Sequence, residues 1–181
     1  MLLLVGLGNP TPNSQNNRHN IGFKIVDAIN QKFGLSKQKP KFKGLLTTGN
    51  IGDKKIYAIK PLTFMNNSGI CIRELLEYFK IDAEDVIVFH DDLDVEFGKI
   101  KAKFGGSSAG HNGIASIDKF IGKEYSRVRI GIAKPKIPIE IGDYVLQNFD
   151  EDELVGIDKI SENITESIGD LIKKKLDIFS S

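Results

Sequence analysis

Apolar residues recur along this chain in two patterns, short continuous runs and helical repeats. The runs at 2–7 and 86–89 end in turn-forming or polar residues, which is typical of buried strands. From Asn20 onward the apolar residues follow the spacing of one helix face as far as Phe33, and Gly34 is placed to end that helix. Strands and helices alternate in this way along the chain. The pattern predicts an α/β fold, with a twisted, mixed and mostly parallel sheet covered by helices on both faces.

The remaining elements follow from the same two patterns. Segments 45–50 and 55–59 form a predicted hairpin around Gly52-Asp53, whereas the basic segment 37–43 is interpreted as a connector. Strands are also expected at 100–104 and 128–132, and helices at 68–80, 112–121 and 154–175, the last with three lysines in its final turn. No repeat or linker divides the chain, so residues 1–181 are predicted to form one catalytic domain.

Composition narrows the class of protein. With 40% apolar and 27% charged residues, the chain has the composition of a water-soluble globular domain. No apolar stretch approaches the roughly 20 residues of a membrane-spanning helix, and the start lacks the basic region of a signal peptide. A single cysteine, Cys71, excludes an internal disulfide and a cysteine-based zinc site. We therefore expect a cytoplasmic protein without a membrane partner.

The net charge of +1 conceals an asymmetry along the chain. Residues 96–136 hold nine Lys/Arg and three Asp/Glu, a balance of +6, whereas residues 150–181 hold four and nine, a balance of −5. One reading is that the lysines only solvate a surface. The other is a cationic face that binds an anionic partner such as nucleic acid.

Polar residues are concentrated where strands are expected to end. In α/β sheets, sites gather at the carboxyl ends of strands, which brings together Asn9, Asp91 and the glycine-rich loop at 105–110. His19 lies just before a helix, and Asp91 is suited to orient an imidazole and to stabilise its cation. Asn9, Asn66 and Asn112 fit either helix caps or neutral donors to a carbonyl oxygen that becomes negative.

Two cofactor hypotheses fit the sequence poorly. Gly6-Leu7-Gly8 follows a strand like a dinucleotide fingerprint, but Thr11 stands where the third glycine belongs, and prolines nearby oppose a helix start. A tight turn explains these glycines as well. A hard-metal site could use the residues His90, Asp91, Asp92 and Asp94, but alternate residues of an extended segment point to opposite faces, and no second cluster completes the shell. We therefore expect neither cofactor nor metal.

Residues 106–110 read Gly-Ser-Ser-Ala-Gly and match the nucleophile elbow of serine hydrolases. That pattern requires the order Ser, Asp, His, whereas His19 and His90 precede Ser108 and only His111 follows it. Chain order does not forbid a convergent triad, so a serine esterase that uses Ser108 stays an alternative. The other reading is a mobile loop, or a surface for close approach, made of small residues.

Five segments together resemble the bacterial-type peptidyl-tRNA hydrolase family. They fall in the family's order and spacing, and the similarity runs from Leu3 to about Phe149. The segments are Val5-Gly6-Leu7-Gly8-Asn9-Pro10, Arg18-His19-Asn20-Ile21-Gly22, Lys60-Pro61-Leu62-Thr63-Phe64-Met65-Asn66-Asn67-Ser68-Gly69, His90-Asp91-Asp92-Leu93-Asp94, and Gly110-His111-Asn112-Gly113 with Arg127-Val128-Arg129-Ile130-Gly131-Ile132. Each motif alone is weakly specific, whereas five in order are strongly so.

The resemblance implies a monomeric hydrolase that needs neither metal nor cofactor. Its substrate would be peptidyl-tRNA released from stalled ribosomes, bound by its acceptor stem and 3′ CCA end and cut at the ester to the terminal ribose. His19 would be the general base and Asp91 its orienting carboxylate. The residues implied to contact peptide, terminal adenosine or water are Asn9, Phe64, Met65, Asn66 and Asn112, with His111 as a histidine of the gate loop and Lys103 and Arg129 as a phosphate clamp.

The sequence departs from the family pattern at four positions. Thr11, Ser14 and Asn17 replace the usual Gly, Tyr and Thr, and Ala109 replaces a Gly of the loop. None of these changes removes a proposed catalytic group. A non-catalytic RNA-binding module remains the alternative from another class of protein; it explains the basic middle of the chain but not the placement of His19 and Asp91.

Overall fold

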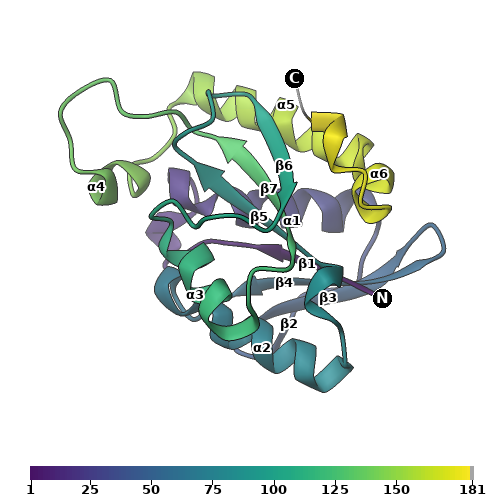
Figure 1. The fold of residues 1–181 in the computed structure, drawn as a ribbon. Coiled ribbons are helices and arrows are strands. Elements are labelled where there is room, and N and C mark those ends of the chain that lie inside the picture. Colours follow the sequence, from purple (N-terminus) through teal and green to yellow (C-terminus); the bar gives the residue numbers. More distant parts are fainter. Residues whose placement is uncertain (180–181) are drawn as a thin grey trace.

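One mixed sheet of seven strands forms the centre of the computed structural model, which describes residues 1–179 (Figure 1). Across the sheet, the order is β2-β3-β4-β1-β5-β7-β6. The four inner strands β4, β1, β5 and β7 are parallel, and antiparallel strands complete both edges. The predicted mixed sheet with a parallel core is confirmed. The strands are β1 (Leu2–Gly6), β2 (Lys39–Lys41), β3 (Gly44–Ile51), β4 (Lys54–Pro61), β5 (Val86–Asp92), β6 (Ile100–Phe104) and β7 (Ser126–Gly131).

Alternating side chains of the inner strands build a hydrophobic core on each face of the sheet. Leu2 and Leu4 of β1 belong to one core, and Leu3 and Val5 to the other. The first core is closed by α1 (Ile21–Lys32), α5 (Glu151–Glu166) and α6 (Ile168–Ile172), and the second by α2 (Ser68–Phe79) and α3 (Asn112–Ile121). Both cores share one sheet, so the architecture is a single α/β domain with helices on both faces, as predicted.

A glycine sets how closely α1 approaches the sheet. A Cβ atom on Gly22 would lie 2.4 Å from both the Leu7 nitrogen and the Phe89 oxygen, so the helix begins against the backbone of β1 and β5. Only glycine permits this approach. The residues just before α1 are thereby held at the carboxyl ends of the two central strands.

The single helix expected at 154–175 is wrong. Helix α5 begins earlier, at a capping box in which Asp150 and Glu153 satisfy each other's backbone N–H groups, and it ends before Ser167. The short helix α6 follows in a new direction that buries Ile168, Leu171 and Ile172 in the core. The buried residues of both helices keep one helical spacing across the break at Ser167, and the lysines at 173–175 follow α6 instead of forming its last turn.

Two other segments differ from expectation. The basic connector at 37–43 contains the edge strand β2, which tolerates Pro40 because an edge strand needs no donor on its outer side. Residues 141–145 form the short helix α4 (Ile141–Val145), for which no apolar periodicity gave a signal. Within residues 1–179, no helix combines the length and apolar character that a membrane crossing requires.

Candidate active site

His19 and Asp91, which the sequence placed together, are in direct contact. His19 lies in the 3-10 turn η2 (Arg18–Asn20) before α1, and Asp91 lies near the end of β5. The His19 Nδ1 atom is 2.8 Å from the Asp91 Oδ2 atom, and both residues are buried. A carboxylate can only accept, so Nδ1 donates to Asp91 and Nε2 is left as the basic nitrogen of a neutral His19 ring.

The other oxygen of the same carboxylate is held by His111. The His111 Nε2 atom lies 2.8 Å from Asp91 Oδ1, and its Nδ1 accepts hydrogen bonds from the backbone of Gly113 and Ile114. His111 is therefore the N-cap of α3, a position for which Asn112 was one of the candidates. With both ring nitrogens engaged, His111 cannot serve as a base in this arrangement.

Charge keeps Asp91 ionised in spite of its burial. Burial by itself raises the pKa of Asp91, but His19 and His111 outweigh that effect and hold its pKa well below the usual range. Burial by itself lowers the pKa of His19, but the charge and the hydrogen bond of Asp91 together hold its pKa above the ordinary value. Burial and the Asp91 carboxylate thus act on the pKa of His19 in opposite directions, and the carboxylate prevails.

His90 is buried beside this pair but stays uncharged. Its Nδ1 donates to the Asp91 backbone oxygen at 2.8 Å, while its Nε2 is buried with no hydrogen-bond partner among the described residues. Burial, reinforced by the nearby His111, lowers the pKa of His90 to about 3. His90 therefore supports the wall of the site as a neutral ring.

Asparagine side chains shape one side of the site. The Asn9 Oδ1 atom accepts from the Met65 backbone at 2.8 Å, which leaves the amide NH₂ of Asn9 available. Asn20, a residue that the sequence did not single out, exchanges two hydrogen bonds of 2.9 Å with the Asn9 backbone. The motif Arg18-His19-Asn20 carried the only sequence signal for it.

These groups line a cavity of about 510 Å³, here called the asparagine cavity. Its wall includes His19 and five of the expected contact residues, namely Asn9, Phe64, Met65, Asn66 and Asn112. Phe64 is 54% exposed and has φ +63° and ψ 156°, a backbone conformation that side chains strongly disfavour. An exposed ring held in a strained backbone is typical of a functional position.

A second cavity opens on the other side of His19. It has a volume of about 460 Å³, and its wall includes Asp91, Lys103, Arg127 and Arg129; we call it the cationic cavity. The Arg129 Nε atom donates to Asp92 Oδ2 at 2.7 Å. Burial and the neighbouring arginines lower the pKa of Lys103. The proposed clamp residues Lys103 and Arg129 thus lie on antiparallel neighbours β6 and β7, in one cavity with His19 and Asp91.

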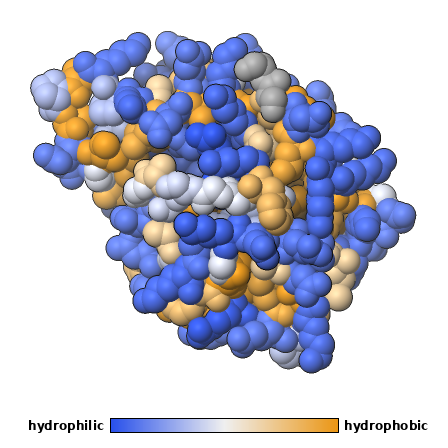
Figure 2. All heavy atoms as spheres, in the orientation of Figure 1, coloured by the Kyte–Doolittle hydropathy of each residue, from blue (hydrophilic) through white to orange (hydrophobic). Residues whose placement is uncertain are grey.

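Arg127 is a further residue of this cavity that the sequence analysis missed. It is buried, and its guanidinium donates to the backbone oxygens of Ser107, at 2.8 Å, and Gly105. These bonds tie the glycine-rich loop to β7. Alternation along the strand places Arg127 on the same face as Arg129, a signal that could have identified it. The pale surface that crosses the middle of Figure 2 coincides with this loop, between β6 and α3 in Figure 1.

The serine motif does not form a nucleophile elbow with a base. The left-handed backbone of the loop falls on glycines and on Ala109, with φ +47°, and not on the serine. Ser107 Oγ accepts from the Ala109 backbone, and the Ser108 carbonyl accepts from the His111 backbone. Within residues 1–179, no histidine nitrogen lies within hydrogen-bond distance of the Ser108 hydroxyl.

The cofactor hypotheses find little support in the geometry. A Cβ on Gly6 would lie 2.2 Å from the Gly22 oxygen, so Gly6 serves the close contact with α1. Of the proposed metal ligands, Asp92 is paired with Arg129 and His90 with the Asp91 backbone. The set His19, Asp91 and His111 gathers its donor atoms within 4.8 Å, but those atoms already bond one another, and a cation would have to displace both hydrogen bonds.

Of the four departures from the family pattern, Thr11 and Ser14 line the asparagine cavity, Ala109 lies in the glycine-rich loop, and Asn17 lies outside both. The hydroxyls of Thr11 and Ser14 bond each other, and Asn17 is buried in a bridge with Asn148. Two small hydroxyl side chains therefore border the asparagine cavity, and at Ser14 one stands in place of the usual tyrosine ring. Ala109 takes the left-handed conformation of the glycine that it replaces, at a steric cost.

Comparison with known proteins agrees with this geometry. The family model described as peptidyl-tRNA hydrolase matches residues 3–180. The peptidyl-tRNA hydrolase of Pelagibacter ubique is 78% identical over all of this chain and 97% of its own length, and that of Bacillus subtilis is 43% identical over 88% and 85%. A crystal structure of peptidyl-tRNA hydrolase from Acinetobacter baumannii superposes with a TM-score of 0.90 at 33% identity, covering 97% of this chain and 90% of that one. The chain belongs to the peptidyl-tRNA hydrolase family.

Proposed function

We propose that this chain hydrolyses the ester between a peptide and the 3′-terminal ribose of tRNA, with His19 activating water. One observation carries the proposal. The His19 ring is held through Nδ1 by a buried carboxylate at 2.8 Å, while the ring borders two cavities that are large enough for substrate. A base oriented by a carboxylate next to a substrate cavity is the arrangement that water activation requires.

The reaction would proceed through one tetrahedral intermediate. His19 Nε2 takes a proton as the water oxygen attacks the ester carbonyl, and Asp91 stabilises the imidazolium that forms. The C–O bond to the ribose then breaks, and His19 returns the proton to the leaving ribose oxygen. A positioned base contributes roughly 10²–10⁴-fold to the rate, which is adequate for an activated ester.

The oxyanion would be met by neutral donors. Because the oxygen of the Asn9 amide is fixed by the Met65 backbone, its NH₂ group is oriented before substrate binds. Asn66 and Asn112 border the same cavity and supply further amides. One such donor contributes about 10²–10³-fold.

The cationic cavity would hold the phosphates of the acceptor stem and the CCA end. Lys103 and Arg129 supply charge, and phosphate contacts position a nucleic acid without reading its sequence. All transfer RNAs share their 3′ end, so such readout is unnecessary. Every group in this scheme comes from one chain, so a monomer is sufficient.

The decisive experiment measures turnover of peptidyl-tRNA in EDTA by wild-type protein and by His19→Ala. We expect the wild type to be active and the variant to lose about 10²–10⁴-fold in kcat while binding tRNA normally. A circular dichroism spectrum identical to that of the wild type controls for folding. A variant that keeps a tenth of its activity would exclude His19 as the base, and an inactive wild type that still binds tRNA would favour a non-catalytic RNA-binding module.

A further inference from the structure

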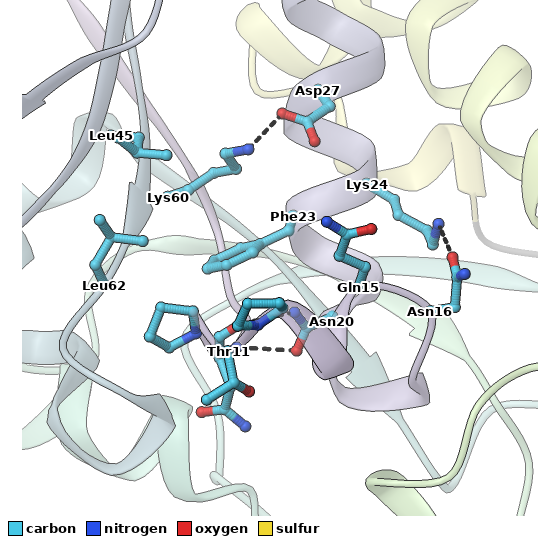
Figure 3. Close-up of a pocket in the computed structure, with 13 residues that line it drawn as sticks. Thr11, Gln15, Asn16, Asn20, Phe23, Lys24, Asp27, Leu45, Lys60 and Leu62 are labelled. Carbon is cyan, nitrogen blue, oxygen red and sulfur yellow. Dashed lines mark hydrogen bonds and ion pairs between the residues drawn. The ribbon is translucent and has the colours of Figure 1, made fainter.

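A third cavity lies next to the asparagine cavity and has no role in the scheme above. It has a volume of about 480 Å³ and is shown in Figure 3; we call it the Phe23 cavity after the ring at its centre. Asn9 and Thr11 line both this cavity and the asparagine cavity. The two spaces are therefore separated only by the ridge at 9–11.

The lining of the Phe23 cavity is apolar at its base and polar at its edge. Phe23, Leu45 and Leu62 supply the apolar surface, whereas the edge carries Lys60 paired with Asp27, and Lys24 paired with Asn16 (Figure 3). The cations of the edge are thus matched locally by a carboxylate and an amide. The cationic cavity differs, because it holds several Lys and Arg side chains. The Phe23 cavity therefore fits an uncharged chain better than a polyanion.

Lys60 is placed to bind a carbonyl oxygen. The residue is 8% exposed, and its ammonium lies 2.7 Å from Asp27 Oδ1, which is its one hydrogen bond within residues 1–179. An ammonium has three N–H donors, so donors remain for a ligand that enters the cavity. The Lys60 ammonium is buried, has N–H donors to spare and lies above an apolar floor. Such a site suits a peptide, whose backbone supplies carbonyls and whose side chains supply apolar surface.

The three cavities form a series. The cationic cavity and the asparagine cavity share His19, and the asparagine cavity and the Phe23 cavity share the ridge. If tRNA phosphates occupy the first and the ester lies at His19, the acyl chain leads away from the nucleic acid, toward the third. On the side of the asparagine cavity, the hydroxyl of the ridge residue Thr11 bonds that of Ser14.

We infer that the Phe23 cavity is a subsite for the peptide residues that follow the ester-linked aminoacyl group, with Lys60 donating to a peptide carbonyl. This inference rests on the proposed function. It predicts that the Phe23 cavity, which lies outside the His19–Asp91 pair, makes the enzyme cleave longer peptidyl chains faster than a single aminoacyl group. It also predicts that this difference can be removed while the basal ester hydrolysis stays intact.

The test compares two substrates with the same ester-linked residue, an N-acetyl-aminoacyl-tRNA and a tripeptidyl-tRNA. Lys60→Met removes the donor and leaves Asp27, half exposed to water, able to be solvated; Lys55→Met on the same strand is its control. Leu45→Trp fills the Phe23 cavity from β3 at a residue that does not line the asparagine cavity, and Leu45→Met is its control. We expect Lys60→Met to lower kcat/KM for the tripeptidyl substrate about tenfold, the effect of one hydrogen bond to a charged group, and Leu45→Trp to lower it as well. The N-acetyl substrate should be cleaved as by the wild type.

Each other outcome overturns the inference. Equal losses on both substrates would mean that Lys60 and Leu45 support the fold of the site. Weaker binding of deacylated tRNA would mean that the cavity contacts RNA. Unchanged kinetics on the tripeptidyl substrate would show that the cavity stays empty during turnover. A wild-type protein that cleaves neither substrate would refute the proposed function itself, which is a distinguishable result.

Discussion

Replacing Asp91 by asparagine tests the proposed roles of the carboxylate with a nearly isosteric change. In the folded protein this carboxylate accepts one hydrogen bond of 2.8 Å from His19 and another of 2.8 Å from His111. An amide offers one oxygen and one NH₂, so it can accept from only one of the two rings. The other ring then faces a donor and must change tautomer or move. His19 keeps its basic nitrogen but loses a charged partner or its fixed orientation.

The size of the loss follows from the bond that is removed. A hydrogen bond to a charged group contributes about 1.5–3 kcal/mol, and this one is buried, so solvent screening is weak. If that stabilisation acts on the imidazolium in the transition state, kcat should fall roughly 10- to 100-fold, less than in His19→Ala. Stability should also fall, and urea unfolding of the variant measures that effect separately.

The pH profile supplies the sharper result. In the wild type, Asp91 holds the pKa of His19 above its ordinary value, so activity is lost as the pH falls through that raised pKa. In Asp91→Asn the burial of His19 remains and lowers its pKa, so the acid limb should move to lower pH. The assay is kcat against pH for both proteins on the same peptidyl-tRNA. An acid limb that stays in place, or moves to higher pH, would refute the assignment of His19 as the titrating base.

Three further predictions concern neighbouring groups. Lys103→Ala and Arg129→Ala should weaken full-length tRNA substrates and reduce the salt dependence of KM, with little effect on a substrate truncated to the terminal nucleotides; equal losses on both would indicate a structural role. Ser108→Ala should reduce kcat by less than about tenfold, and an acyl adduct found on this serine by mass spectrometry would contradict the water mechanism. Because the pKa of His90 is lowered to about 3, the unfolded chain takes up its proton first, and stability falls as the pH drops below 6.5. The free energy of unfolding, measured by urea titration, should fall between pH 7 and pH 5 by about 2 kcal/mol less in His90→Gln than in the wild type. An equal fall in both proteins would exclude His90 as the cause.

The central part of the fold and the proximity of His19 to Asp91 could be predicted because each depends on a local pattern. The apolar run of β5 placed Asp91 at a strand end, and the helix signal after Asn20 placed His19 at a helix start. The rule that sites gather at the carboxyl ends of strands then joined them. By contrast, the contact of His111 with Asp91 depends on the path of a loop with four left-handed residues, and no periodicity describes such a path.

Tertiary packing decided the features that sequence reasoning missed. The break at Ser167 divides the predicted helix although Ile164, Ile168 and Leu171 keep the helical spacing and are all buried, so the continuous pattern gave no sign of it. The Phe23 cavity joins residues from the segment before α1, from α1 itself and from β3 and β4, so only the folded chain reveals it. Arg127 could have been predicted from the sequence, because its spacing from Arg129 places both side chains on one face of the strand.

The strained backbone at Phe64 lowers the stability of the fold at a position that borders the asparagine cavity. A side chain at φ +63° and ψ 156° costs on the order of 1–3 kcal/mol, and the peptides around it are pinned by the Met65–Asn9 and Asn67–Phe64 hydrogen bonds. Phe64→Gly would release that strain and, since the ring is largely exposed, would sacrifice little buried surface. A selection for thermal resistance alone is thus expected to favour glycine here. Because the ring borders the asparagine cavity, we expect phenylalanine to be retained where selection acts on turnover.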